Sequence, residues 1–424
     1  MNTGDSLSAH IRLGLQCRDL RRFTDAEEHF KGALGEDPRD DLALHFLASS
    51  VHAQDGREKE ALRIIDDAIA ISPNDAAHHA LRAFILNSLD RPKDALIAAG
   101  TARELDPYGE DAWIAEAQAF LRQQQWSKAE QAAREALALD ADSSFAANLL
   151  ASALRMQKKN AENEAQIAGL LQRDPEDAYT HYNAGWSALQ INDHARAESH
   201  FREALRLDPE FEPAREGLLT SFRARSAFYR AYLRYSFAMA RLTERARWAV
   251  IIGIYLVFRY VRSLARNVSP GLAIGITALY FLFVLWGFVA DAVGNFILIF
   301  DRFARHALRR DEKAEAIVVG GSIVSGVTLL VVGFCFGWSW TLVLGGSLVA
   351  AAIPLSMAFT NKSRAGSILF GGIGIVILAS AGVAIAALAL GNKSLFDGAL
   401  TWLIFGGIGA LLSTWLSNVR ALRR

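Results

Sequence analysis

A pattern that recurs about every 34 residues runs through the first half of the chain and constrains its fold more than any other feature. Each recurrence ends in a short dipeptide, at Asp37-Pro38, Ser72-Pro73, Asp106-Pro107, Asp140-Ala141, Asp174-Pro175 and Asp208-Pro209. The second residues of these dipeptides are separated by 35, 34, 34, 34 and 34 positions. A fixed period in this range is typical of a solenoid, in which similar supersecondary units stack on one another.

Small and large residues recur at fixed positions within each period, and the small ones fall where two helices must touch. They are Leu13-Gly14, Ala26, Phe30 and Ala33 in the first period, Ala83, Ala95 and Ala102 in a middle one, and Ala184-Gly185, Ala197, Phe201 and Ala204 in the last. Only Ala or Gly lets two helix backbones approach closely, and the proline ends the second helix. This pattern resembles the tetratricopeptide repeat (TPR) family over roughly residues 5–225. The resemblance implies about six helix pairs and a closing helix near 213–225, with the fifth unit, 142–175, the most divergent.

The resemblance also implies a concave wall, built from the first helix of each pair, that binds a peptide or another protein. Tyr179, Tyr182 and Trp186 project onto this wall at helical spacings of three and four. Further candidates along the wall are Arg155, Asn148, Arg122, Gln118, Asn87, Phe84 and Arg18. Aromatic and Arg side chains favour interfaces energetically. The alternative interpretation is that Tyr179 and Trp186 pack between adjacent repeats.

The formal net charge of zero conceals an asymmetry between the two halves. Residues 1–222 hold 38 acidic and 24 basic side chains, whereas residues 223–424 hold 7 acidic and 21 basic ones. Such asymmetry indicates that the basic half lies against an anionic partner. Hydrophobic runs follow the basic segment at once, so we expect anionic membrane lipids and no nucleic acid as that partner. Cys17 and Cys335 fall in different halves, which argues against a structural disulfide.

The end of the repeats and the changes in charge and hydrophobicity predict three domains. They are a solenoid over 1–225, a neck with a short first hydrophobic segment over 226–266, and a multi-pass membrane domain over 267–424. Aromatic residues alternate with arginines over 228–247, which predicts an amphipathic helix along a lipid interface. The arginines expected to contact lipid headgroups are Arg223, Arg225, Arg230, Arg234, Arg241, Arg245 and Arg247.

Six hydrophobic stretches follow, at 248–264, 271–290, 315–337, 340–358, 366–390 and 398–418. A membrane-spanning helix needs about 20 mostly apolar residues, and the last five stretches meet or nearly meet that length. The first is marginal because Arg259 and Arg262 interrupt it. We adopt six spans and keep four as the alternative. The run at 295–310 is predicted to form a second interfacial helix.

Charged connections set the expected orientation. Basic residues gather at 301–313, 360–364 and 419–424, and the positive-inside rule places these connections in the cytosol together with the neck. The N-terminus shows no charged leader followed by an apolar core, so we expect no cleavable signal peptide. These features predict a bacterial inner-membrane protein with a cytosolic solenoid. Glycine pairs such as Gly333/Gly337 predict close helix packing within one protomer, with homo-oligomerisation as the alternative.

Side chains with catalytic or metal-binding chemistry are sparse. Asp291 ends a hydrophobic stretch and is predicted to cap a helix. His78-His79 and His194 lack a metal-ligand spacing with acidic or Cys partners, so we predict solvated helix positions for them. In the hydrolase-like string at residues 4–8, Asp5 or Ser6 is expected to cap the first helix instead. We therefore expect no catalytic residues, no cofactor and no metal site.

Together these observations predict an all-α protein, a TPR solenoid followed by a polytopic α-helical membrane domain. Its arrangement resembles bacterial TPR proteins with a C-terminal multi-pass membrane region, a resemblance that implies no particular activity. The expected function is a non-enzymatic scaffold that recruits a protein or peptide partner to the cytoplasmic face of the membrane. The alternative is a transporter, channel or secretion-system component with a cytosolic TPR regulatory arm.

Overall fold

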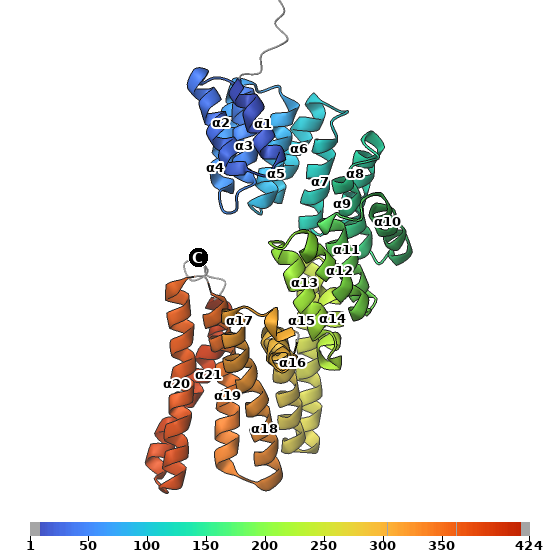
Figure 1. Cartoon of the computed structure of the whole chain (residues 1–424). Helices are drawn as coiled ribbons and strands as arrows, with labels where there is room; N and C mark the ends of the chain where they lie inside the picture. The colour runs from blue at the N-terminus through green and yellow to red at the C-terminus, as the bar shows by residue number, and fades with distance from the viewer. Residues whose placement is uncertain (1–8, 303, 362, 417–424) are drawn as a thin grey trace, which may run out of the picture. The chain divides into compact units, whose positions relative to one another are not determined.

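The computed structural model describes residues 9–302, 304–361 and 363–416, and each secondary-structure element within these ranges is helical (Figure 1). The all-α fold class is therefore confirmed for the described residues. The chain divides into two compact units. Unit 1 holds Met1–Ser187 and Arg206–Pro209, and unit 2 holds Ala188–Leu205 and Glu210–Arg424. The string at residues 4–8 and the basic connection at 419–424 lie outside the described residues.

Helix pairs and a closing helix form the repeat half. The pairs are α1 (Ala9–Asp19) with α2 (Phe23–Glu36), α3 (Asp41–His52) with α4 (Glu58–Ile71), α5 (Ala76–Ser88) with α6 (Pro92–Leu105), α7 (Glu110–Arg122) with α8 (Trp126–Leu139), α9 (Ser144–Met156) with α10 (Asn160–Arg173), and α11 (Ala178–Gln190) with α12 (His194–Leu207). The closing helix is α13 (Glu212–Arg223). The predicted six pairs are thus confirmed, and the divergent fifth unit forms the pair α9–α10.

The turn inside each pair contains one residue with a left-handed backbone. These residues are Arg21, Gly56, Asp90, Gln124, Lys158 and Asn192, with φ between 56° and 80°. They are separated by 35, 34, 34, 34 and 34 positions, so the backbone repeats with the sequence. A left-handed residue lets the chain leave one helix and enter the next within a few residues. Only one of the six is Gly, and each of the others carries strain of about 1 kcal/mol or more that the packing of its pair must offset.

Asp residues at the ends of four of the periods stabilise the turns between pairs. The Oδ1 atoms of Asp37, Asp106, Asp140 and Asp174 each accept a hydrogen bond from the backbone N–H two residues further on, at 2.9 to 3.0 Å. This Asx turn supplies the backbone with a local partner where the helix ends. Asp140 is followed by Ala141 and makes the same bond, so the turn depends on Asp rather than on the following Pro.

Close backbone approach explains the small residues. A Cβ on Gly14 would lie 2.5 Å from Cε1 of Phe30, and a Cβ on Gly217 would lie 2.3 Å from Cε1 of Phe201. Both phenylalanines are fully buried. The same Gly–Phe contact therefore joins α1 to α2 in unit 1 and α12 to α13 in unit 2.

Glutamates at one recurring position on the second helices connect neighbouring pairs. The ion pairs are Glu27–Arg57 at 2.5 Å, Glu130–Lys159 at 2.8 Å and Glu198–Arg225 at 2.8 Å. The glutamates are 103 and 68 positions apart, which is three and two periods. The hydrogen bonds from Arg57 lower the pKa of Glu27 to about 2. These carboxylates are therefore part of the cohesion of the solenoid rather than of a site.

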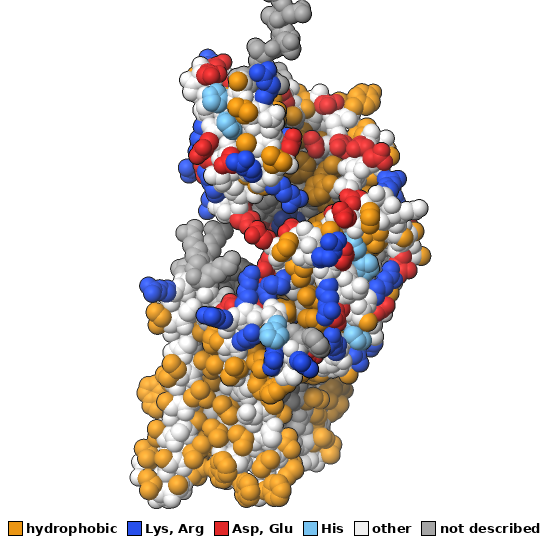
Figure 2. All heavy atoms as spheres, in the orientation of Figure 1, with side chains coloured by type: hydrophobic (Ala, Val, Ile, Leu, Met, Phe, Trp, Pro, Cys, Tyr) orange, Lys and Arg blue, Asp and Glu red, His pale blue; other side chains and the backbone are white. Residues whose placement is uncertain are grey.

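The second half of unit 2 is a series of longer, more apolar helices. They are α14 (Ala227–Ala240), α15 (Glu244–Val268), α16 (Pro270–Ile299), the 3-10 turn η1 (Ala304–His306), α17 (Arg310–Glu315), the π-helical turn η2 (Ala316–Gly320), α18 (Gly321–Phe336), α19 (Ser339–Thr360), α20 (Arg364–Ala389) and α21 (Lys393–Leu416). On the face drawn in Figure 2, hydrophobic side chains cover α18 to α20, and Lys and Arg side chains gather at the end near α17.

Four helices in the described part of the chain are long and apolar enough to cross a membrane: Arg245–Val268, Arg310–Phe336, Ser339–Thr360 and Arg364–Ala389. The first of them corrects the expectation of a short first segment, because Thr243 begins a helix that runs on for 25 residues. Arg259, Arg262 and Arg266 lie exposed in its second half. The helices α16 and α21 coincide with the other two hydrophobic stretches of the sequence.

Both predicted interfacial helices differ from the structure. The helix expected over 228–247 is interrupted after Ala240, and the Thr243 hydroxyl accepts a hydrogen bond from the N–H of Ala246 to begin α15. Residues 295–299 continue α16 instead of starting a new helix. This end of α16 packs closely on η2, since a Cβ on Gly320 would lie 2.5 Å from the carbonyl oxygen of Ala292 and 2.6 Å from Cβ of Phe296.

Glycines place α18 directly against α19. A Cβ on Gly326 would lie 2.9 Å from the oxygen of Gly345, and a Cβ on Gly345 would lie 2.7 Å from the oxygen of Gly326. A Cβ on Gly374 of α20 would lie 2.7 Å from Cγ of Leu355 in α19. These glycines serve helix packing within one chain, as small residues do in membrane proteins. Homo-oligomerisation remains a prediction.

Candidate functional site

Aromatic side chains of α11 form the candidate partner-binding surface in unit 1. The rings of Tyr179 and Tyr182 lie 5.6 Å apart, and those of Tyr182 and Trp186 lie 6.3 Å apart and nearly perpendicular. All three side chains are half-buried. They therefore contact the solenoid on one side and keep surface available on the other, which combines the two interpretations that the sequence left open.

Two arginines from neighbouring repeats lie close to this aromatic group. Burial raises the pKa of Tyr179, whereas the positive charges of Arg155 and Arg122 act in the opposite direction. Arg122 ends α7 and Arg155 lies in the last turn of α9. The first helices of three successive repeats thus carry two arginines whose charges act on the phenol of Tyr179. Cationic and aromatic side chains together are suited to an acidic peptide that also carries apolar residues.

The two asparagines predicted to line the wall are buried between repeats instead. Asn148 is 1% exposed and donates to the Asp177 carboxylate at 3.0 Å. The Asn148 Oδ1 in turn accepts a hydrogen bond from the Asn183 side chain at 2.8 Å. Asn87 is 2% exposed and donates to the carbonyl oxygen of Ala115 at 3.0 Å. A buried amide must be hydrogen-bonded. Asn87 and Asn148 therefore join adjacent first helices and are not open to a partner.

The remaining predicted wall residues are partly engaged by their neighbours. Phe84 is half-buried and packs on two of the apolar clusters of unit 1. The guanidinium of Arg18 lies 5.2 Å from the ring centre of Phe46, a cation–π distance. Gln118 accepts a long hydrogen bond from Asn87 at 3.5 Å. The partner-binding proposal therefore concentrates on Arg122, Arg155 and the aromatic group of α11.

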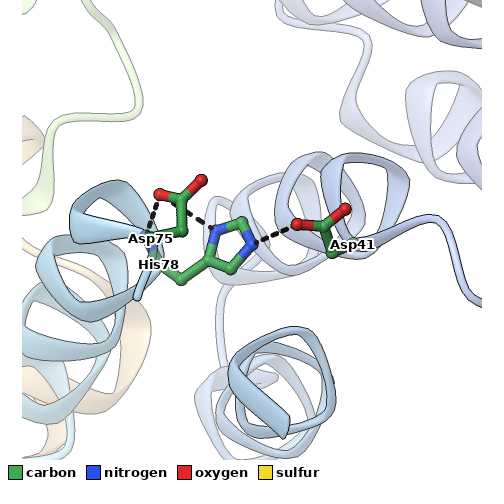
Figure 3. A group of neighbouring side chains, drawn as sticks. All are labelled: Asp41, Asp75 and His78. Atoms are coloured by element: carbon green, nitrogen blue, oxygen red, sulfur yellow. Dashed lines mark hydrogen bonds and ion pairs between the residues drawn. The ribbon is translucent and has the colours of Figure 1, made fainter. Parts of the chain in front are cut away.

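His78 corrects the expectation of a solvated histidine. It is 2% exposed and lies between Asp41 and Asp75 (Figure 3). Its Nε2 lies 3.2 Å from Asp41 Oδ2, and its Nδ1 lies 3.2 Å from Nδ1 of His45. Burial, followed by the nearby His78, lowers the pKa of His45 to about 4, so His45 is neutral at pH 7. Periodicity missed this pairing because the histidine faces its carboxylate across 37 residues.

Asp41, Asp75 and His78 present ligand atoms within 4.8 Å of one another, a spacing that a metal ion can use. Figure 3 shows the two carboxylates at opposite edges of the imidazole, with Asp41 at Nε2 and Asp75 at Nδ1. Each carboxylate therefore lies closest to a different ring nitrogen, Asp41 at 3.2 Å and Asp75 at 3.8 Å. Asp75 also caps α5 by accepting from the N–H of Ala77 at 2.8 Å. The group fits hydrogen bonding between α3 and α5 better than metal binding.

Ion pairs join the closing helix α13 to the apolar helices of unit 2. Arg215 pairs with Glu312 of α17 at 2.7 Å and donates to the carbonyl oxygen of Ala307 at 3.1 Å. Arg309 pairs with Glu212 at 2.6 Å. The hydrogen bond to Glu312 raises the pKa of Arg215 further above its usual range. Residue spacing does not reveal these contacts, although acidic residues are so rare after residue 222 that each was a candidate partner.

Two of the arginines expected at lipid headgroups also belong to this junction. Arg223 donates to Asp291 at 2.9 Å and to the Asn295 side chain at 2.9 Å, and only 11% of its side chain is exposed. Arg225 pairs with Asp301 at 2.9 Å as well as with Glu198. Asp291 lies inside α16, so its role is ion pairing rather than the predicted helix capping.

The other neck arginines have different surroundings. Arg230 donates to the carbonyl oxygens of Ala224 and Arg225 at 3.1 and 2.8 Å. Arg241 donates to the Gln190 side chain at 2.6 Å. Arg234 and Arg245 are exposed, and Arg247 is half-buried. Lipid-headgroup contact therefore stays a prediction, carried chiefly by Arg234, Arg245 and Arg247.

Comparison with known proteins agrees with the repeat pattern. Residues 18–85, 114–178 and 178–211 match family models that are each described as tetratricopeptide repeat. The chain is 25% identical to human protein O-mannosyl-transferase TMTC3 over 230 residues, which cover 50% of this chain and 25% of that protein. It is 41% identical to tetratricopeptide repeat protein 33 of Xenopus laevis over 61 residues, covering 14% of this chain and 24% of that protein.

This chain therefore spans about a quarter of the length of those two relatives. Among solved structures, a tetratricopeptide repeat protein from Parabacteroides merdae is similar to 57% of this chain and to 95% of its own length. The sequence identity there is 18% and the TM-score is 0.42.

Proposed function

We propose, from the premise that this chain belongs to the tetratricopeptide repeat family, that it is a membrane-anchored adaptor whose solenoid recruits a protein or peptide partner to the cytoplasmic face of a membrane. The observation that carries the proposal is the combination of an aromatic and cationic surface on the solenoid with apolar helices in the same chain. One part supplies recognition and the other supplies location.

The anchoring half of the proposal rests on length, composition and charge. Four described helices are long and apolar enough to span a bilayer, and α16 and α21 complete the six spans that we propose. Basic side chains before α15 and around α17 favour a cytosolic location for the neck and therefore for the solenoid. A bacterial inner membrane is the proposed location. Arg234, Arg245 and Arg247 are the proposed contacts with anionic headgroups.

Protease protection tests this topology. In intact cells whose outer barrier has been removed, added protease should leave the solenoid intact, whereas in inverted membrane vesicles it should release fragments of residues 1–225. Alkaline extraction should leave the full chain in the membrane fraction. Digestion of the solenoid from outside intact cells contradicts the cytosolic orientation, and recovery of a freely soluble chain contradicts the anchor.

Site-specific crosslinking tests the recognition half. A photoreactive amino acid at Tyr182 should give a discrete adduct in native membranes, because Tyr182 lies in the middle of the aromatic group. The matched control is Ile97, which is 69% exposed on a second helix. The adduct at Tyr182 should disappear in the double variant Arg122→Ala, Arg155→Ala. Equal adducts at Tyr182 and Ile97, or an adduct insensitive to the arginines, count against this surface.

A second candidate function is favoured by the number of apolar helices, since a single span is enough for anchoring. Transport or secretion by the membrane half, regulated by the solenoid, would give the additional apolar helices a role. Ion or solute flux in liposomes that contain the purified full-length chain distinguishes the two: flux favours the transporter, and its absence alongside the Tyr182 adduct favours the adaptor.

We propose a non-enzymatic role in either case. The similarity to a human O-mannosyl-transferase covers only 25% of that protein, so its activity does not carry over by itself. Incubation of the purified chain with lipid-linked mannose and an acceptor protein should give no mannosylated product. Product formation by the chain overturns this part of the proposal.

A further inference from the structure

A cavity of about 620 Å³ lies within unit 2 between α14, α16, α18 and α19. Its walls include Phe228 of α14, Phe283, Trp286 and Val293 of α16, Val327 of α18 and Val349 of α19. Thr328 is also in the wall, but its hydroxyl donates to the Val324 carbonyl oxygen at 2.8 Å. None of the lining residues is charged. A cavity with carbon walls is suited to a hydrocarbon chain and unsuited to a hydrated solute.

The cavity opens where exposed side chains from three helices form its wall. Three of its wall residues are well exposed, Leu279 at 69%, Phe228 at 47% and Val324 at 41%. Each comes from a different helix, and α18 belongs to a segment apolar enough to cross a membrane. In the proposed bilayer placement, this opening faces lipid.

Trp286 brings a polar group to the otherwise apolar wall. Its indole Nε1 is enclosed and has no hydrogen-bond acceptor among the described residues. Buried tryptophan N–H groups usually find an acceptor. Trp286 precedes Asp291 by five residues on α16, which places it roughly 7.5 Å along the helix from the polar junction. The ester carbonyl of a phospholipid lies at such a depth, between headgroup and hydrocarbon, and can accept this hydrogen bond.

The helix α14 carries a cation three residues beyond the cavity wall. Phe228 and Ala231 line the cavity, and Arg234 follows Ala231 by three residues on the same exposed helix face. The helix itself is held on α16 by ring contacts, Phe228 to Trp286 at 5.3 Å and Tyr235 to Phe283 at 5.6 Å. A guanidinium on the helix that lines an apolar cavity is complementary to an anionic phosphate whose acyl chain enters the cavity.

We infer that this cavity is a binding site for one anionic phospholipid, with an acyl chain between α16 and α18, an ester carbonyl at Trp286 Nε1 and the phosphate at Arg234. The inference rests on the proposed membrane location. It adds a specific lipid to the general headgroup contact of the neck, and it makes the lipid a structural link between α14 and the spans.

The test uses the full-length chain purified in detergent and stripped of lipid. Native mass spectrometry during titration with phosphatidylglycerol should show one retained lipid per chain, and phosphatidylcholine with the same acyl chains should be retained about tenfold less. Arg234→Gln should abolish this preference. Val327→Phe, which fills the cavity, should lower retention of both lipids at least about tenfold. The matched control is Val331→Phe, one turn further along α18 and 57% exposed outside the cavity, which should leave retention unchanged.

A second readout is independent of whether the Val327 variant folds. Phosphatidylglycerol with brominated acyl chains should quench tryptophan fluorescence of the natural chain at one lipid per chain, and Trp286→Phe should remove that quenched component. Equal retention by the Val327 and Val331 variants, or stoichiometric quenching that persists in Trp286→Phe, overturns the site. Alkaline extraction of the same variants keeps the two proposals apart. A chain that stays in membranes but retains no lipid contradicts only this inference, whereas a soluble chain contradicts the anchor.

Discussion

Arg223 of α13 donates a hydrogen bond to Asp291 of α16 at 2.9 Å, although the two residues are 68 positions apart in the sequence. The same carboxylate accepts a hydrogen bond from the Tyr229 hydroxyl at 2.6 Å. Burial raises the pKa of Tyr229, so its phenol remains a donor across the physiological range. A residue of the closing helix is thereby held by a helix of the apolar half, inside one compact unit.

We expect Arg223→Met to destabilise unit 2 by about 1.5–3 kcal/mol, because it removes charged hydrogen bonds to Asp291 and Asn295. The melting temperature in detergent, followed by intrinsic fluorescence, measures the effect. Arg302→Met is the control, since Arg302 is exposed in the same unit. An equal melting temperature for the two variants means that the junction contributes nothing to stability.

Gly217→Ala should destabilise the protein by about 1–3 kcal/mol, because the new Cβ lies 2.3 Å from the buried Phe201 ring. Gly100→Ala is the matched control in another helix, where nothing lies within 4 Å of the new Cβ. It should stabilise by about 0.5–1 kcal/mol through helix propensity. Denaturant unfolding followed by circular dichroism measures both. The same sign for the two substitutions contradicts the assigned contact.

Acid should weaken the solenoid through Glu27. Its pKa is about 2 in the folded chain, chiefly because of Arg57, against an ordinary value of 4.5. A depressed carboxyl pKa stabilises the fold fully above about pH 4.5, and this contribution is lost as the pH falls toward 2. Glu27→Gln should therefore flatten the pH dependence of stability in that window, by up to about 3 kcal/mol.

Glu135→Gln, at an exposed position of α8, is the matched control for the loss of a surface carboxylate. Unfolding midpoints measured from pH 5 to pH 2 compare the two variants with the natural chain. Identical curves for the natural chain and Glu27→Gln show that the ion pair with Arg57 does not contribute.

Metal chelation should leave the first repeats unchanged. The two carboxylates near His78 lie at opposite ring edges, so we expect neither EDTA nor excess Zn²⁺ to shift the melting temperature. Asp75→Ala should lower stability by about 1 kcal/mol with or without metal, because it removes the cap of α5. A melting temperature that rises with Zn²⁺ and loses this rise in Asp75→Ala points to a metal site after all.

Much of the repeat half could be read from the chain because its interactions are local or recur at one period. The Asp of each Asx turn and the Gly that faces a Phe lie within one repeat of their partners, so a pattern of 34 positions contains them. The aromatic group of α11 was visible for the same reason, since Tyr179, Tyr182 and Trp186 share one helix face. Asn87 and Asn148 were misplaced because periodicity identifies a helix face but not which side chains the next repeat covers.

By itself, the order of residues determined the helix pairs and the apolar segments, because both depend on short-range spacing and on hydrophobicity. Only the tertiary structure decided that Arg215 meets Glu312 and that Arg223 meets Asp291. These partners are 97 and 68 positions apart and belong to no repeat. Their distance depends on how α13 packs on α16 and α17. The sequence does not distinguish an arginine that contacts lipid headgroups from one that pairs with a carboxylate of the same chain, because only the fold brings the acid within reach.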